Sequence, residues 1–251
     1  MTKNPGFKNE DNMVFSLNNR RFGELNQNLK FMLLNIYDFI EDDEIINCEL
    51  VPGRMKPDIV ISCHGIKKYI SIKHGRAKTI HQQEIETFIK ALRLYGADQK
   101  VIKWILYLFY CDGTLNGTGK VRYKQYEFQS KYLDTIGKIN DYFERDKELI
   151  QKVVYHCLFQ GIKEEYIHAD YIYFGDPDYG VLCSPKQIRK YIEVSNWKYM
   201  KSVIHIGPLQ FRRHAQYAGT EIKNAEYMSK VDVWWANLEA DMRYISRRYS
   251  D

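Results

Sequence analysis

Several features of membrane and exported proteins are missing from the 251-residue sequence. No apolar run approaches the roughly 18 residues that a membrane-spanning helix needs. The first residues, MTKNPGFKNEDN, are polar and lack the apolar segment of a signal peptide. These absences predict a cytoplasmic protein with no membrane partner. Internal repeats and a clear interdomain linker are also missing, so we expect one large domain or a core with an appended subdomain.

Paired cysteines are missing as well. The five cysteines are scattered along the chain, and no two of them form a CxxC pair. This spacing indicates neither a disulfide framework nor a zinc-binding motif. We expect reduced and mostly buried thiols at Cys48, Cys63, Cys111, Cys157 and Cys183.

Acidic residues are scarce in two parts of the chain. The formal net charge is +5, and residues 185–251 hold 12 Lys or Arg against 7 Asp or Glu. Residues 1–184 hold 25 residues of each sign. A second basic stretch has no acid between Asp58 and Glu84 and contains Lys67, Lys68, Lys73, Arg76 and Lys78. Such surfaces suit a phosphate backbone, and a solvated charged face is the alternative interpretation.

The stretch from Lys56 to Glu86 carries the pattern of a β-hairpin. Two short apolar runs, residues 59–61 and 69–72, flank His64-Gly65, which predicts a tight turn. Asp58 opens the first strand. Alternation along the second strand puts Ser71 and Lys73 on one face. A carboxylate and a lysine are therefore expected on neighbouring strands. Alternatively, Asp58 caps a turn and Lys73 is a solvated strand lysine.

Pro57-Asp58 and the tripeptide Ser71-x-Lys73 resemble the motif of the PD-(D/E)xK nuclease superfamily, in particular type II restriction endonucleases. The resemblance covers about residues 20 to 110. It implies a mixed α/β fold (an α+β mixed sheet) with an αβββαβ core, helices on both faces and a C-terminal α/β extension. Ser71 departs from the motif, because the family usually has Glu or Asp there. Some restriction enzymes share this serine and bring the missing carboxylate from the following helix.

The resemblance implies a magnesium site, and we expect Mn²⁺ to substitute for Mg²⁺. Asp58 and the backbone carbonyl of Ile72 would be metal ligands, while Lys73 would orient water or stabilise charge at phosphorus. Ser71 has no negative charge, but it is suited to hydrogen-bonding a metal-bound water. Three residues are candidates for the second carboxylate: Glu84, Glu86 and, on the opening helix, Glu24. Glu84 is our first choice, because it lies near the start of the helix expected from Thr79.

The remaining periodicity predicts further elements. We expect a polar segment over 1–18, a long helix over 22–40, a strand over 45–51, a helix over 79–96 and a buried strand over 101–110. We also expect helices over 130–160 and 185–194, a hairpin over 170–184, an interrupted strand over 203–211 and a final helix over 230–248. Together with the resemblance, these elements imply a polar segment (1–18), a nuclease-like core (19–120) and a helical and hairpin region for DNA recognition or dimerisation (121–251).

Two groups of residues are expected at the DNA. One group suits base edges, because Arg and Gln make paired hydrogen bonds to guanine and adenine; it contains Arg212, Arg213, His214 and Gln216. The other lies closer to the active site, with Arg76 and Lys78 nearest the phosphates; it contains Arg76, Lys78, His81 and Gln82. An exposed basic loop is the alternative interpretation of the first group.

Three functions fit these patterns. The first is a prokaryotic, Mg²⁺-dependent endonuclease that cuts double-stranded DNA at a specific sequence as a homodimer. The second is a nucleic-acid-binding protein on the same fold, with Ser71 marking lost activity. The third is a nuclease of DNA repair or RNA processing. The recognition sequence does not follow from the chain, because base readout depends on side-chain placement.

Overall fold

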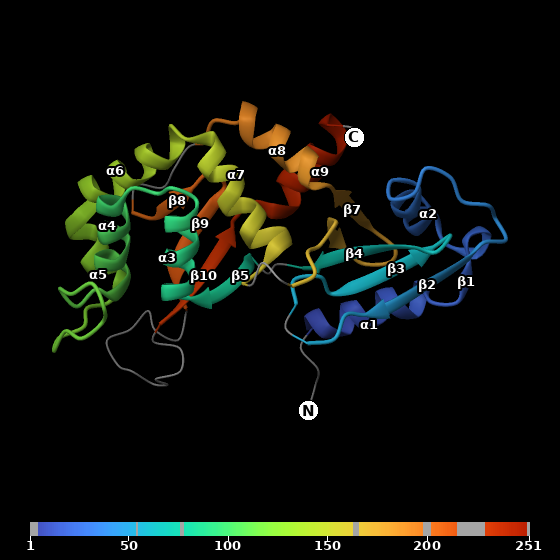
Figure 1. Cartoon of the computed structure of the whole chain (residues 1–251), viewed down its shortest axis with the longest axis horizontal. Helices are drawn as coiled ribbons and strands as arrows, with labels where there is room; N and C mark the ends of the chain where they lie inside the picture. Colours follow the sequence, from blue (N-terminus) through green and yellow to red (C-terminus); the bar gives the residue numbers. More distant parts are fainter. Residues whose placement is uncertain are drawn as a thin grey trace. The chain divides into compact units, whose positions relative to one another are not determined.

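A computed structural model describes residues 5–53, 55–75, 78–162, 166–197, 202–214 and 229–249. The chain forms two compact units that each combine distant segments (Figure 1). Unit 1 comprises Met1–Ala77, Leu158–Tyr191 and Asn237–Asp251; unit 2 comprises Lys78–Cys157 and Ile192–Ala236. The division expected from the sequence, at residues 18 and 120, does not coincide with these boundaries.

Unit 1 contains a mixed sheet of six strands. In spatial order the strands are β1 (Arg20–Arg21), β2 (Ile45–Leu50), β3 (Ile59–Cys63), β4 (Ile66–Lys73), β6 (Tyr171–Gly175) and β7 (Gly180–Cys183). Strands β4 and β6 are parallel, and the other neighbours are antiparallel. The mixed α/β class predicted from the sequence is therefore confirmed.

The predicted hairpin is present as β3 and β4. Its two-residue turn has positive φ at both His64 (51°) and Gly65 (75°), as a tight turn between twisted strands requires. Pairing runs from Cys63 with Ile66 to Ile59 with Ile70. The expected strand over 45–51 and the hairpin over 170–184 are also confirmed, as β2 and as β6 with β7.

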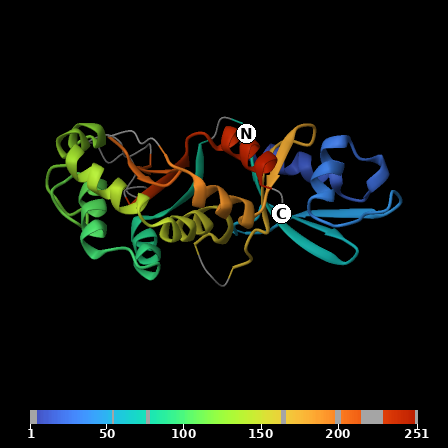
Figure 2. The same ribbon diagram turned by 90° about the horizontal axis from the view of Figure 1, so that it is seen from above.

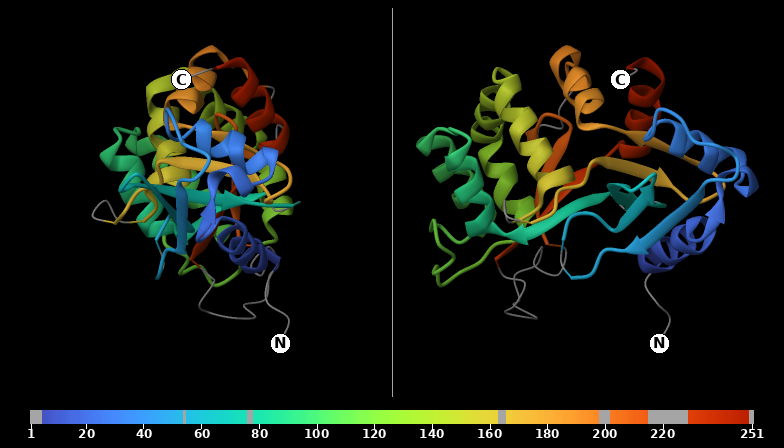
Figure 3. Two further views of the ribbon diagram at one scale, coloured as in Figure 1. Left: turned by 90° about the vertical axis from the view of Figure 1, so that its right-hand side faces the viewer. Right: turned by 45° about the vertical axis from the view of Figure 1, so that its right-hand side comes forward.

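The helices of unit 1 correct two expectations. The first 18 residues are not a loose polar segment, because Pro5–Leu17 forms α1, which lies against β2 (Figure 3). Met13 and Leu17 lie one turn apart on α1 and are fully buried. The prediction of one long helix over 22–40 is also wrong. The chain there forms a short 3-10 helix, η1 (Phe22–Glu24), and then α2 (Gln27–Leu34).

Unit 2 contains an antiparallel sheet of four strands. In spatial order they are β5 (Thr79–Glu84), β10 (Lys230–Trp235), β9 (Leu209–Arg213) and β8 (Ile204–Ile206). Its helices lie beside this sheet (Figure 2). They are α3 (Ile85–Leu94), α4 (Gln99–Tyr110), α5 (Gln125–Gln129), η2 (Ser130–Tyr132), α6 (Leu133–Glu144) and α7 (Lys147–Tyr155). Two elements cross the boundaries between the units: η3 (His156–Gln160) and α8 (Pro185–Val194).

Three expectations fail in this part of the chain. Residues 79–84 are strand β5, so the helix expected from Thr79 begins only at Ile85. The apolar run over 101–110 is helix α4, whose N-terminus is capped by Asp98. The helix expected over 230–248 is strand β10 followed by α9 (Leu238–Arg248). The elements expected over 130–160, 185–194 and 203–211 are confirmed as α6 with α7, as α8, and as β8 with β9.

No helix in the described ranges is both long and apolar enough to cross a lipid bilayer.

Candidate active site

Asp58 is fixed by backbone and side-chain hydrogen bonds just before β3. Its amide donates to the carbonyl of Ile70 (2.8 Å), and its own carbonyl accepts from Val51 (3.0 Å). Its side-chain Oδ2 accepts from the amide of Ile72 (2.5 Å) and from the hydroxyl of Ser71 (3.2 Å). The carboxylate is therefore oriented by two groups of the neighbouring strand β4.

Lys73 is the last residue of β4 and lies beside that carboxylate. Its Nζ is 3.6 Å from Asp58 Oδ2 and donates a 2.8 Å hydrogen bond to the carbonyl of Ile72. Both side chains are about four-fifths buried, with exposed fractions of 20% and 21%. Screening by water is reduced in such a place, so the ion pair is electrostatically stronger than one at the surface. The structure thus brings together Asp58, Ser71, Ile72 and Lys73.

Glu10 of α1 is a further acid at this site, and the sequence interpretation missed it. Burial and the negative charge of Asp58 raise its pKa to about 7, while the positive charge of Lys73 opposes the shift. The adjacent Asn9 donates a 2.9 Å hydrogen bond to the carbonyl of Gly175, the last residue of β6. Because Phe174 of β6 pairs with Lys73, this bond places the start of α1 at the Lys73 end of the sheet.

A sequence signal for Glu10 did exist. Pro5 is the first residue of α1, a position that proline favours, and Met13 and Leu17 are spaced as one buried helical face. A helix read from this pattern would have put Glu10 one turn before Met13.

The register of β2 removes Glu24 from the site. Glu24 is exposed in η1, directly after β1, which pairs with the start of β2 at Ile45. Leu50, at the other end of β2, pairs with Ile59 next to Asp58. Glu24 therefore lies toward the opposite end of the sheet from Asp58. The expectation that it ligates the same metal is corrected on this ground.

Glu84 and Glu86 belong to unit 2, whereas Asp58 and Lys73 belong to unit 1. Glu84 ends strand β5, and its carboxylate accepts a short hydrogen bond from the Ser229 hydroxyl. Glu86 lies in the first turn of α3. Glu84 therefore ends a strand and does not lie within a helix that starts at Thr79, as the sequence interpretation supposed. Within unit 1, Glu10 is an acid whose charge interacts with that of Asp58.

The residues expected at DNA bases fall into different environments. Arg213 on β9 is only 3% exposed, and burial with the positive charge of Arg122 lowers its pKa to about 10. Arg212 lies over the ring of Trp234 at 4.4 Å and donates to Gln210 (2.7 Å). His214 is partly buried. Because Arg213 is covered, the expectation that it reads base edges is corrected; Gln216 lies outside the described residues.

The second predicted group is also divided. His81 is buried on β5 and packs edge-to-face on His156, with ring centroids 5.4 Å apart, so it does not offer a surface donor. Gln82 is exposed and donates to Asp232 (2.8 Å). Lys78 is exposed just before β5. Arg76 lies outside the described residues.

A basic hollow of about 340 Å³ lies on helix α9 in unit 1. Arg243, Arg247 and Arg248 line it, together with Ala240 and Tyr244. The guanidinium of Arg243 pairs with Glu239 at 2.9 Å and lies over the ring of Tyr179 at 4.0 Å. Helix α9 packs on β7, in the sheet that carries Asp58 and Lys73. Sequence reasoning found the basic excess of this region but not this hollow.

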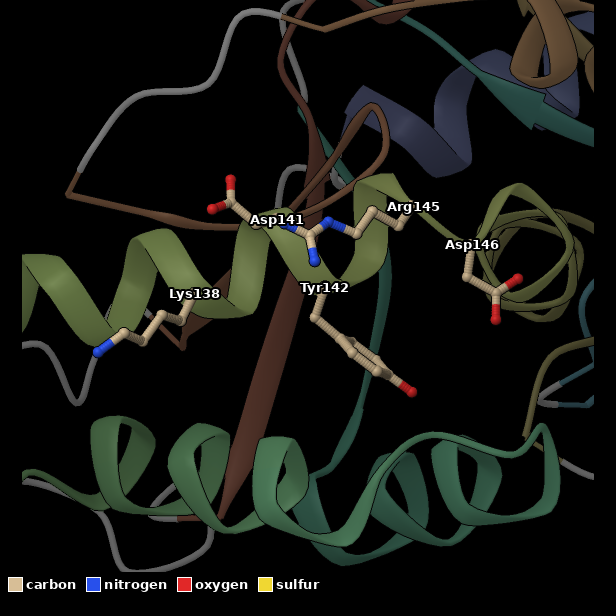
Figure 4. A pocket seen from close by; sticks show the side chains of 5 residues that line it. All are labelled: Lys138, Asp141, Tyr142, Arg145 and Asp146. Atoms are coloured by element: carbon tan, nitrogen blue, oxygen red, sulfur yellow. The ribbon is translucent and has the colours of Figure 1, made fainter.

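A second hollow of about 390 Å³ lies on α6 in unit 2 (Figure 4). The side chains that line it include both positive and negative charges, and several of them are bound to nearby residues. Lys138 pairs with Asp134 (2.6 Å), Asp146 caps the amide of Leu149 (2.9 Å), and Tyr142 accepts from the amide of Asp98 (2.8 Å). We assign it no role in the site.

The groups around Asp58 fit a hard divalent cation. Asp58 and Glu10 offer carboxylate oxygens, and Ile72 offers a backbone carbonyl, which are the donors that Mg²⁺ prefers. The pKa of Glu10 is raised first by burial and then by repulsion from Asp58, and a bound cation would relieve this repulsion.

Comparisons of the chain with models of known protein families, with curated proteins and with solved structures give no match.

Proposed function

We propose that this protein is a Mg²⁺-dependent nuclease that hydrolyses phosphodiester bonds of double-stranded DNA. The observation that carries the proposal is the Asp58–Lys73 pair, 3.6 Å apart at one end of the β3–β4 hairpin, with Glu10 of α1 near enough for its charge to interact with both. Carboxylates that can hold a cation, together with a lysine beside them, suit metal-assisted hydrolysis of a phosphodiester.

The topology of unit 1 supports the finer assignment to the PD-(D/E)xK fold. Helix α1 precedes an antiparallel meander of three strands, β2, β3 and β4. The chain then passes through the helices of unit 2 and returns as β6, parallel to β4. This order resembles an αβββαβ core in which the crossover has been enlarged. The motif residues lie at the start of the second strand and the end of the third, as the resemblance implies.

In this proposal each side chain has a distinct task. Asp58, Glu10 and the carbonyl of Ile72 hold the cation, and Ser71 keeps the Asp58 carboxylate in one orientation. Bound Mg²⁺ would lower the pKa of water and offset charge on the phosphate. Lys73 is held by Asp58 and Ile72, so its ammonium has a fixed position from which to stabilise the charge that develops at phosphorus.

The arginines of α9 support a nucleic acid as the substrate. Three of them line one hollow without an acid among its lining residues. One guanidinium group can donate two parallel hydrogen bonds to a phosphate, and the binding affinity from such contacts falls as the salt concentration rises. Cutting at a specific sequence by a homodimer remains part of the proposal through the resemblance to restriction enzymes.

The test is cleavage of several plasmids with and without Mg²⁺, comparing wild type with Lys73→Met. Lys67→Met is the matched control, because Lys67 is exposed on the same strand and the same face. We expect metal-dependent cutting that falls by about 10²-fold or more in Lys73→Met and is unchanged in Lys67→Met. Discrete fragments would support a sequence-specific enzyme, and a smear a nonspecific one.

One observation favours a second candidate, a DNA-binding protein without activity. The motif acid is replaced by Ser71, which is fully buried and bound to Asp58. Shifted but uncut plasmid with both Mg²⁺ and Mn²⁺ would support this candidate and reject the nuclease.

A further inference from the structure

The far end of the β3–β4 hairpin gathers three side chains of a different kind. The ligand atoms of Glu44, Cys63 and His64 all lie within 4.8 Å of one another. We propose that these three residues bind a Zn²⁺ ion at the tip of the hairpin. Asp58 and Cys63 are separated by the length of β3, about 16 Å at roughly 3.3 Å per residue, so this site is distinct from the active site.

The backbone fixes all three ligands. Cys63 ends β3 and pairs with Ile66, and His64 is the first residue of the turn, with φ of 51°. Glu44 directly precedes β2, which pairs with β3, and its Oε1 accepts from the amide of His64 (3.3 Å). The three residues are thus joined by sheet pairing and a turn, so the ligands need little ordering when an ion binds.

The imidazole of His64 is oriented as in many metal sites. Its Nε2 lies 3.2 Å from the carbonyl oxygen of Phe39, and a carbonyl only accepts, so Nε2 carries the proton. In the neutral ring Nδ1 then has the free lone pair, and Nδ1 lies 3.5 Å from Glu44 Oε1. Histidine ligands generally donate their second N–H to such a carbonyl or carboxylate.

The chemistry of the three ligand atoms favours Zn²⁺ over Mg²⁺. Sulfur, nitrogen and one carboxylate oxygen suit Zn²⁺, whereas Mg²⁺ prefers oxygen alone. Burial and the charge of Glu44 raise the pKa of the Cys63 thiol to about 11, so Zn²⁺ binding would release its proton to solvent as the thiolate bonds to the metal. Three protein ligands leave the fourth tetrahedral position for water or a group from a partner.

The test is titration of the full chain, freed of affinity tags, with Co²⁺ as a spectroscopic substitute for Zn²⁺. In the presence of excess Mg²⁺ we expect one Co²⁺ ion per chain, a thiolate-to-cobalt absorption in the near ultraviolet and tetrahedral visible bands that Zn²⁺ removes. Cys63→Ser should abolish the ultraviolet band. Cys48→Ser is the control, because Cys48 is equally buried on the neighbouring strand.

Two further variants keep the proposal testable if Cys63→Ser fails to fold. His64→Asn keeps a residue that tolerates positive φ, and Glu44→Gln keeps the shape of the side chain. Each should weaken Co²⁺ binding by at least about 10-fold, as loss of metal-site contacts does. A folded wild-type protein without the thiolate band, or a band that persists in Cys63→Ser, would overturn the proposal.

Discussion

The carboxylate of Asp58 accepts a 2.5 Å hydrogen bond from the amide of Ile72, the residue that precedes Lys73. This bond joins the start of β3 to the end of β4 and brings Asp58 Oδ2 within 3.6 Å of Lys73 Nζ. A one-residue slip of the hairpin register would move Lys73 to the other face of the sheet. The register of the hairpin therefore determines the geometry of the site.

Asp58→Asn should abolish cleavage without unfolding the protein. The amide oxygen still accepts from Ile72, but the negative charge is gone, so we expect a loss of about 10²-fold or more in single-turnover cleavage with Mg²⁺. Asp178→Asn is the control, because Pro177-Asp178 repeats the same dipeptide in an exposed turn. Equal rates for wild type and Asp58→Asn would reject the site.

Glu10→Gln should weaken Mg²⁺ binding, because the site then has one carboxylate instead of two. We expect the Mg²⁺ concentration for half-maximal cleavage to rise by at least about 10-fold. Glu24→Gln should leave it unchanged, because Glu24 lies toward the opposite end of β2. If instead only Glu24→Gln raises the requirement, Glu10 is not the second ligand.

The raised pKa of Glu10 predicts a pH dependence of stability. Between pH 4.5 and about 7 the folded state holds a proton on Glu10 that the unfolded state has lost. The contribution of Glu10 to the free energy of unfolding therefore falls as pH rises through this window. Urea unfolding without metal at pH 5 and pH 8 measures it. Glu10→Gln should gain stability over wild type at pH 8 and lose that advantage at pH 5; a constant difference would contradict the shift.

Ser71→Glu tests whether the site accepts the motif acid. The new carboxylate would lie buried next to Asp58, so we expect lower stability without metal and greater thermal stabilisation by Mg²⁺ than in wild type. In the Glu10→Gln background it should partly restore cleavage. Ser71→Ala should cost only about 1 kcal/mol of stability, measured by denaturant unfolding, because one hydrogen bond is lost. No effect of Mg²⁺ on Ser71→Glu would contradict a cation beside Asp58.

The double variant Glu84→Ala, Glu86→Ala should keep Mg²⁺-dependent cleavage. In our proposal Glu10 of unit 1 supplies the second carboxylate, so the two acids of unit 2 are not needed as ligands. We expect a loss of about 1–3 kcal/mol in the free energy of unfolding, because Glu84 no longer accepts from Ser229. Loss of cleavage in a folded double variant would return Glu84 or Glu86 to the metal site.

Local patterns were sufficient for the central hairpin. Alternation over 59–63 and 66–73 and the His64-Gly65 turn involve neighbours in sequence, and they put Ser71 and Lys73 on one strand next to Asp58. Hairpin β6–β7 and helix α8 follow from similar short-range signals, a Gly-Asp-Pro-Asp turn and a proline at the first helical turn.

The predictions that failed concern segments whose neighbours in the fold come from distant parts of the chain. The run over 101–110 is apolar enough for either a buried strand or a buried helix, and its surroundings in unit 2 decided for a helix. Residues 230–235 became a strand because β5 and β9 offer hydrogen bonds on both sides.

The second carboxylate depended on tertiary structure in the same way. By itself the sequence determined Asp58 and Lys73, because one hairpin brings them together through local geometry. It did not determine Glu10, which is 48 positions before Asp58 and reaches the site only because α1 packs on β2 and Asn9 bonds to the end of β6. Spacing along a chain specifies which residues share a strand or a turn, but only the packing of a helix on a sheet decides which distant acid completes the site.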